Sequence, residues 1–205
     1  MDAARRSYHH GDLRRVLLEA GIELAREGGP EAVVLREATR RAGVVPNAAY
    51  RHFASRDALL QAVRAAALAA LAVAMEKELG RARKQPDVAR ASLRAIGIAY
   101  LRFAEREPGL FRTAFSVAAD PETTGDPDWA GRSGMNPFQL LGAALDQMVK
   151  AGAMPAEQRP GAEYLAWSAV HGLAMLALEG PLRRMTRKQI QEIGQRVVAM
   201  VEKGL

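Results

Sequence analysis

Residues 36–56 carry five arginines against a single acid, Glu37; the arginines are Arg36, Arg40, Arg41, Arg51 and Arg56. A guanidinium group binds phosphate oxygens through several N–H donors, so a cluster of this kind favours a polyanionic partner. The net charge of the whole chain, +6, favours the same class of partner only weakly. From charge alone, a basic face that is merely solvated is an equally good interpretation.

A second chemical feature lies within residues 40–53. Gly43 ends one helix and Pro46 begins the next, which is typical of a tight turn between two short helices. Asn-Ala-Ala at 47–49 has small side chains, which would let the backbone approach DNA closely. The Tyr-Arg-His that follows at 50–52 can reach phosphates, which position a protein on DNA without reading its sequence.

The common catalytic constellations are absent from the sequence. There is no cysteine, which excludes thiolate nucleophiles and cysteine metal sites, and there is no Gly-x-Ser-x-Gly, P-loop or Gly-x-Gly-x-x-Gly motif. The histidines share no helix with carboxylates at metal-ligand spacing; they are His9, His10, His52 and His171. We therefore expect no enzymatic activity, no cofactor and no metal.

Helical periodicity covers most of the chain, and strand-like alternation never exceeds a few residues. Ser55 and Thr186 are the predicted starts of two of the helices, the second through a capping box with Gln189. Residues 118–136 predict a loop, either a gate or a solvated loop. The helices are expected at about 13–28, 35–42, 46–53, 55–80, 86–108, 110–115, 137–152 and 161–180, and from 186 to the end.

The stretch LREATRRAGVVPNAAYRHFASRDALLQAV resembles the amino-terminal domain of TetR-family transcriptional repressors. The resemblance is carried by the Ala-Gly-Val that ends the second helix, by Tyr-Arg-His-Phe, by Arg56-Asp57 and by Leu59-Leu60. It implies a three-helix helix-turn-helix domain over residues 10–65, followed by a helical ligand-binding and dimerisation domain over 66–205. The expected fold is therefore all-α, with about nine helices.

The resemblance also implies a set of DNA contacts. Arg36 and Arg56 are expected on phosphates at the starts of the second and fourth helices, while Tyr50 and His52 hold the DNA backbone. Val44 and Phe53 are expected in the core. The groove-facing residues would be Pro46, Asn47, Ala48 and Arg51.

Four positions depart from the family pattern. Val34 and Val45 stand where the family commonly has a hydroxyl residue, and the missing side-chain cap at Val45 is worth about 1 kcal/mol. Ala38 and Ala49 replace larger apolar residues. These changes are expected to weaken the domain or to shift its sequence preference, without abolishing the pattern.

The fifteen residues YLAWSAVHGLAMLAL, 164–178, carry no charged side chain. A helix that is apolar around its circumference must be covered on all sides, either by its own chain and a second subunit or as the central helix of a monomer. We expect it to be covered by its own chain and a second subunit, because the two DNA-binding domains of a dimer match the two half-sites of a palindrome. The final helix is expected to supply the dimer interface through Ile190, Ile193, Gly194, Val197 and Val201.

The same stretch resembles a regulatory domain named for its Trp-His-Gly signature, here Trp167, His171 and Gly172. The family typically binds an effector between these helices, which implies a mostly apolar site with a few polar groups. From the pattern alone, an aromatic stripe belongs to a core more often than to a pocket. The residues expected to contact the effector are Tyr100, Phe103, Phe111, Phe115, Met148, Trp167, His171 and Met175.

Together these features predict a cytoplasmic, ligand-responsive transcriptional regulator, expected to be a repressor, that binds a palindromic operator as a homodimer. Release by a small hydrophobic or aromatic effector is expected, and no membrane association. Two alternatives remain: a basic DNA-binding protein indifferent to sequence, and an activator on the same fold. The amino-acid pattern names neither the operator, nor the regulated genes, nor the effector.

Overall fold

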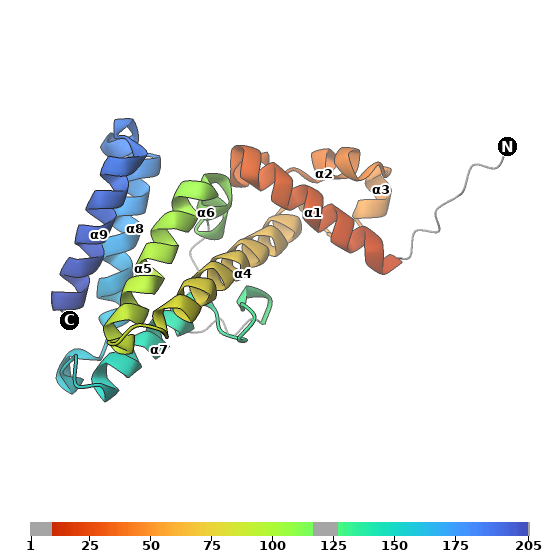
Figure 1. The fold of residues 1–205 in the computed structure, drawn as a ribbon. Helices are drawn as coiled ribbons and strands as arrows, with labels where there is room; N and C mark the ends of the chain where they lie inside the picture. Colours follow the sequence, from red (N-terminus) through yellow and green to blue (C-terminus); the bar gives the residue numbers. More distant parts are fainter. Residues whose placement is uncertain (1–9, 117–126, 205) are drawn as a thin grey trace. The chain divides into compact units, whose positions relative to one another are not determined.

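The computed structural model describes residues 10–116 and 127–204, and this part of the chain is helical with no strand (Figure 1). The all-α prediction is therefore confirmed. Within these residues the nine α-helices are α1 His10–Gly28, α2 Leu35–Ala42, α3 Pro46–Ala49, α4 Arg56–Ala82, α5 Val88–Arg106, α6 Pro108–Ala114, α7 Pro137–Lys150, α8 Ala162–Leu178 and α9 Arg187–Gly204.

The chain divides into two compact units, and the division falls inside α4, between Ala67 and Leu68. Among the described residues the first unit comprises 10–67 and 109–116, and the second comprises 68–108 and 127–204. The segment 109–116 thus belongs with the first unit, although by sequence it lies inside the expected carboxy-terminal domain.

The first unit is built on α1, which packs against both α2 and α3. Its core side chains are fully or almost fully buried, among them Leu17, Val33 and Phe53. Gly43 ends α2 in the left-handed conformation (φ 68°), which its lack of a Cβ permits, and its N–H bonds back to the helix. The predicted turn between α2 and α3 is therefore present.

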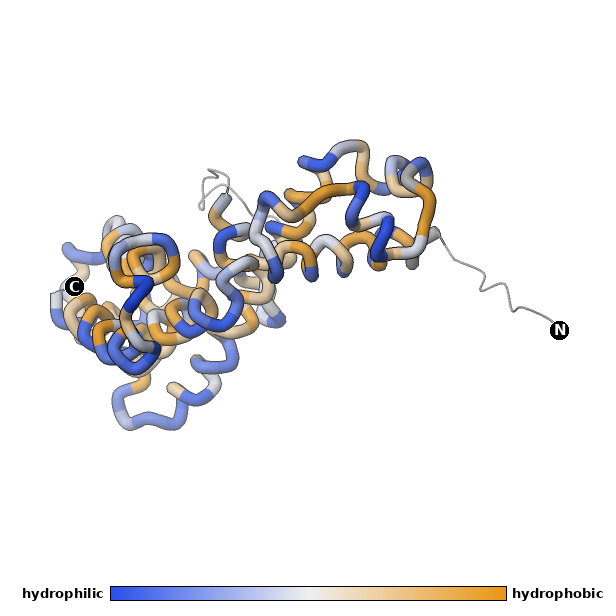
Figure 2. The backbone as a smooth tube through the Cα atoms, turned by 90° about the horizontal axis from the view of Figure 1, so that it is seen from above, coloured by the Kyte–Doolittle hydropathy of each residue, from blue (hydrophilic) through white to orange (hydrophobic). Residues whose placement is uncertain are grey.

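The second unit is organised around α5, which packs against α7, α8 and α9. The side chains of α5 that are buried recur at helical spacing, as at Leu93, Ile96 and Tyr100. Helices of this chain carry both hydrophobic and hydrophilic stretches (Figure 2). Because α8 also packs against α7 and α9, it has neighbours on several sides, as its uniformly apolar sequence requires.

Helix termini follow the capping rules in most cases. The Ser55 hydroxyl accepts the N–H of Ala58 at 3.1 Å, and Thr186 forms the predicted capping box with Gln189. A second capping box, Asn136 with Gln139, starts α7. Helix α3 is shorter than predicted: it ends at Ala49, and residues 50–52 form a turn.

Only part of the predicted loop 118–136 can be placed. Residues 117–126 lie outside the described residues, whereas 127–136 contain the short 3-10 helix Pro127–Trp129 and a turn. The carboxylate of Glu76 on α4 accepts the backbone N–H groups of Arg132 and Ser133, at 3.0 and 2.7 Å. This end of the loop is therefore held on α4 within the second unit.

Helix α4 is long and apolar enough to cross a membrane by length and composition alone. Of the 18-residue window responsible, 56% is buried inside the protein, as in the core helix of a water-soluble fold. The buried side chains include Leu71 and Met75. We interpret α4 as a core helix.

Candidate functional site

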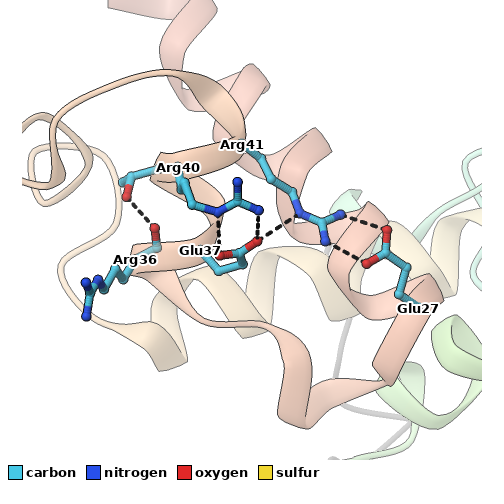
Figure 3. Close-up of polar contacts among 6 residues, drawn as sticks. Glu27, Arg36, Glu37, Arg40 and Arg41 are labelled. Carbon is cyan, nitrogen blue, oxygen red and sulfur yellow. Dashed lines mark hydrogen bonds and ion pairs between the residues drawn. The ribbon is translucent and has the colours of Figure 1, made fainter.

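The arginine cluster of the first unit is partly neutralised on α2 (Figure 3). The guanidinium of Arg40 donates two hydrogen bonds to Glu37, at 2.9 and 2.6 Å. Arg41 donates two to Glu27 of α1, at 2.8 and 2.6 Å, and a longer one to Glu37. Arg40 therefore forms an ion pair within α2, whereas Arg41 also joins α2 to α1, a pairing that sequence proximity does not indicate.

These bonds also set the protonation of the carboxylates. The hydrogen bonds from Arg40 lower the pKa of Glu37 to about 2, with a smaller lowering from Arg41. The pKa of Glu27 is lowered by its hydrogen bonds from Arg41. Both carboxylates are therefore ionised at neutral pH, and the ion pairs are complete.

Two arginines of the cluster stay available to an outside anion. Arg36 extends away from the Glu37 network (Figure 3), and within the described residues neither its side chain nor that of Arg51 makes an ion pair. Arg56 donates to the carbonyl of Pro30 at 2.7 Å, which ties the start of α4 to the segment after α1. It also forms an ion pair with Asp57 at 3.8 Å, and 44% of its side chain is exposed.

The turn and helix after Gly43 present most of the predicted DNA-contacting side chains to solvent. Asn47, Tyr50 and Arg51 are exposed, and Ala48 and His52 are half-buried. Tyr50 is 57% exposed, a large fraction for an aromatic side chain with no hydrogen-bond partner in the described residues. Such a side chain is available to a partner molecule.

Two predictions around α3 need adjustment. Ala49 was grouped with Asn47 and Ala48 as a small residue facing DNA, but it is fully buried in the core of the first unit. The reason is its position on the face of α3 that packs against α1 and α2. Phe53 is buried as predicted, whereas Val44 is only half-buried.

In the second unit, Trp167, Tyr100 and His171 form a hydrogen-bonded chain. Trp167 Nε1 donates to the hydroxyl of Tyr100 at 3.0 Å, and that hydroxyl lies 2.7 Å from His171 Nδ1. Tyr100 is almost fully buried on α5, while Trp167 and His171 are half-buried on α8. The predicted aromatic wall and polar handle are thus joined through Tyr100.

The Tyr100 hydroxyl can donate to one tautomer of His171 or accept from the other. An indole N–H can only donate, so it occupies an acceptor site of the tyrosine oxygen. With the hydroxyl proton directed to His171 Nδ1, the imidazole is neutral and carries its proton on Nε2. Burial lowers the pKa of His171, which favours the same neutral form, and burial raises the pKa of Tyr100.

Two aromatic residues beside this chain were missed by sequence reasoning. The ring of Phe138 on α7 lies 6.1 Å from that of Trp167 and 5.5 Å from that of Tyr164. Tyr164 precedes Trp167 by three residues and so shares its helix face, a signal that was available in the sequence. Phe138 comes from another helix, and only the packing of α7 on α8 brings it there.

Among the eight predicted effector contacts, the hydrogen-bonded chain joins Tyr100, Trp167 and His171. Phe103 and Met148 are buried in the core of the second unit, and Met175 is half-buried one turn beyond His171. Phe111 and Phe115 belong to the first unit, where their rings lie 5.0 Å apart.

The predicted dimer residues of α9 recur at intervals of three and four residues and so share one helix face, but they differ in burial. Gly194 is buried inside the protomer, and a Cβ there would lie 2.9 Å from the side chain of Leu101 on α5. Its assignment to a subunit interface was wrong: the close approach that glycine allows is to α5 of the same chain. The other four are half-buried; they are Ile190, Ile193, Val197 and Val201.

Comparisons of the sequence with family models give two matches. Residues 17–63 match the model described as "Bacterial regulatory proteins, tetR family". Residues 93–201, more than half of the chain, match "Tetracyclin repressor-like, C-terminal domain". None of the curated proteins compared with the sequence matches it. The narrower Trp-His-Gly assignment depends on Trp167, His171 and Gly172 alone and stays a prediction.

Solved structures support the same fold. A protein of unknown function from Rhodococcus sp. RHA1 is 27% identical, with a TM-score of 0.77 and coverage of 98% of this chain and 99% of that one. The TetR-family regulator PfmR from Thermus thermophilus is 22% identical (TM-score 0.60; 93% and 95% covered).

A TetR-family regulator from Pectobacterium atrosepticum is 19% identical, with a TM-score of 0.68 and coverage of 98% of this chain and 97% of that one. The last two likenesses concern the fold alone. The two family-model matches give the family assignment, and the helix-turn-helix geometry of α2 and α3 agrees with it. The chain belongs to the TetR family of bacterial transcriptional regulators, which are DNA-binding transcription factors and not enzymes.

Proposed function

We propose that this TetR-family regulator is a cytoplasmic repressor that binds a palindromic operator as a homodimer and is released by a small hydrophobic or aromatic effector. The observation that carries the proposal is the exposed surface of the first unit formed by Arg36, Asn47, Tyr50 and Arg51. These four side chains make no ion pair or side-chain hydrogen bond within the described residues.

The composition of this surface suits DNA. Arg36 and Arg51 can each neutralise a phosphate, and Tyr50 can donate its hydroxyl to another. Asn47 can form a bidentate pair with adenine in the major groove, so it is the residue best suited to read sequence. Phosphate contacts would set the position of the first unit on the DNA, and Asn47 would supply part of the sequence specificity.

A dimer is supported by apolar side chains that the protomer leaves uncovered. On α8, Leu165 and Leu176 are 65% and 44% exposed, and on α9 Met200 is 62% exposed. Gly172 shares the exposed stripe of α8, and a Cβ there would meet nothing within 4 Å. A mid-helix glycine costs about 1 kcal/mol relative to alanine, so a close approach by a second helix accounts for its presence.

The effector site is proposed around the Trp167–Tyr100–His171 chain. Three polar atoms meet there beside the rings of Phe138 and Tyr164, which matches a ligand site with apolar walls and a few orienting groups. Half-burial of Trp167 and His171 leaves part of this wall accessible. The aromatic lining favours a hydrophobic or aromatic effector.

Helix α4 offers a covalent route from effector to operator, because it contributes to both units. A ligand changes operator affinity only by its differential affinity for the DNA-bound and released forms. Such coupling is typically about 1–3 kcal/mol, or about 5- to 150-fold in affinity.

The test is a selection of random duplex DNA on the full-length protein, with sequencing of the bound fraction at two salt concentrations. We expect a palindromic sequence whose enrichment survives the higher salt, and loss of the base preference in Asn47→Ala. Enrichment of no sequence, with binding that disappears as salt rises, would instead indicate the sequence-indifferent alternative. A reporter gene behind the recovered operator then separates a repressor from an activator.

A further inference from the structure

A groove in the second unit lies between the carboxy-terminal halves of α5 and α8 and the amino-terminal half of α9. It is open to solvent and has a volume of about 1030 Å³, which is at the upper end of the range for sites that hold a small organic ligand. None of the residues proposed above to contact the effector lines it. It is therefore a separate site.

Small residues form part of the lining of the groove: Ala174 and Ala177 on α8 and Gly194 on α9. The lining also includes larger apolar side chains, with Leu101 from α5 and Ile190 from α9. An apolar molecule placed here would remove these surfaces from water, which is favourable in proportion to the area covered.

The charged residues of the groove are three arginines and one acid: Arg102, Arg106, Arg187 and Glu105. Glu105 is neutralised locally, because Arg187 forms a close ion pair with it and Gln191 donates to it at 3.2 Å. Arg102 lies 3.4 Å from Glu78, a carboxylate that Arg81 also uses.

Arg106 has no ion pair or hydrogen bond from its side chain to any described residue. The rim of an apolar groove thus carries an uncompensated positive charge. An apolar groove with such a rim is complementary to a molecule with an apolar body and one negative head group.

We infer that the α5–α8–α9 groove binds an amphipathic carboxylate, with its chain along Leu101 and Ile190 and its head group on Arg106. Arg106, which lines the groove, can bind a carboxylate bidentately. The site is independent of the proposed effector pocket, and its occupancy does not require DNA binding.

Dodecanoate is the probe, titrated into the full-length protein by calorimetry below its micelle concentration. We expect one site per chain, and weaker binding of the uncharged analogue 1-dodecanol. Arg106→Gln should reduce dodecanoate affinity about tenfold or more while leaving dodecanol unchanged. The matched control is Arg83→Gln, an exposed arginine outside the groove.

A second variant tests the cavity itself. Ala177→Phe fills the groove and should abolish binding of both probes, with circular dichroism confirming that the helices are retained. The inference is wrong if dodecanoate does not bind, or if Arg106→Gln binds it as tightly as the wild type. Loss of binding in Trp167→Ala together with full binding in Ala177→Phe would place the ligand in the effector pocket and also overturn it. None of these outcomes bears on the operator selection.

Discussion

At the scale of single residues, two arginines of α2 have different roles. Arg36 and Arg40 are both exposed and four residues apart, yet Arg40 is bound to Glu37 and Arg36 is not. Arg36→Gln should weaken operator binding and reduce the slope of log affinity against log salt by about 1, since one phosphate contact is lost. Arg40→Gln should have a smaller effect on operator affinity and on the salt slope. Equal slopes for Arg36→Gln and the wild type, measured by fluorescence anisotropy, would contradict the assignment of Arg36.

Glu37 should give the first unit a pH-dependent stability. Its pKa in the folded protein, about 2, lies below the ordinary value of 4.5, so the stabilisation is present above 4.5 and is lost as pH falls toward 2. Thermal unfolding followed over this range should show Glu37→Gln less stable than the wild type at pH 7 and the difference shrinking in acid. Glu31→Gln, at an exposed acid without an ion pair in the described residues, is the control. A difference independent of pH would refute the ion-pair explanation.

Tyr100 joins two helices through its hydroxyl. Tyr100→Phe removes the bond that Trp167 Nε1 donates and the bond to His171 Nδ1, while keeping the ring. We expect a loss of about 1–3 kcal/mol in the free energy of unfolding, because buried polar groups lose a partner. Urea unfolding measures it, with the exposed Tyr50→Phe as control. If both variants lose the same amount, the hydroxyl chain has no stabilising role.

At the scale of secondary-structure elements, α3 starts without a side-chain cap. Val45 occupies the N-cap position in an extended conformation, and its side chain is 69% exposed. Val45→Ser should add a hydrogen bond to a free N–H of the first turn and stabilise the protein by about 1 kcal/mol. Val45→Ala is the control, because it removes the isopropyl group without adding a hydroxyl. The melting temperature measures the effect. An equal rise in both variants would show that the cap is not responsible.

At the scale of the whole molecule, the exposed leucines of α8 predict the oligomeric state. Leu165→Glu combined with Leu176→Glu should convert the proposed dimer to a monomer in light scattering, because the proposed subunit interface would then bury two charges per chain. Affinity for a palindromic site should fall as the dimer is lost, while the helix content stays unchanged. The control is Ala156→Glu, which places a charge on an exposed residue elsewhere in the same unit. A double variant that stays dimeric would exclude this face as the interface.

The sequence by itself determined the elements and the family of this protein. Glycine at 43, proline at 46 and the caps at Ser55 and Thr186 act within a few residues of themselves, so helix ends could be predicted from local chemistry. The pattern of Tyr-Arg-His at 50–52 also pointed to the exposed surface of the first unit. What could be predicted from the sequence is therefore local: where the helices and the turn lie, and which side chains project from them.

Only the tertiary structure decided which residues meet. The pairing of Arg41 with Glu27, the packing of Gly194 on Leu101 and the contact of Phe138 with Trp167 all join different helices. Helical periodicity shows that a residue has a buried side, but it does not name the neighbour on that side. For the same reason the α5–α8–α9 groove could not be predicted, because its lining comes from three different helices.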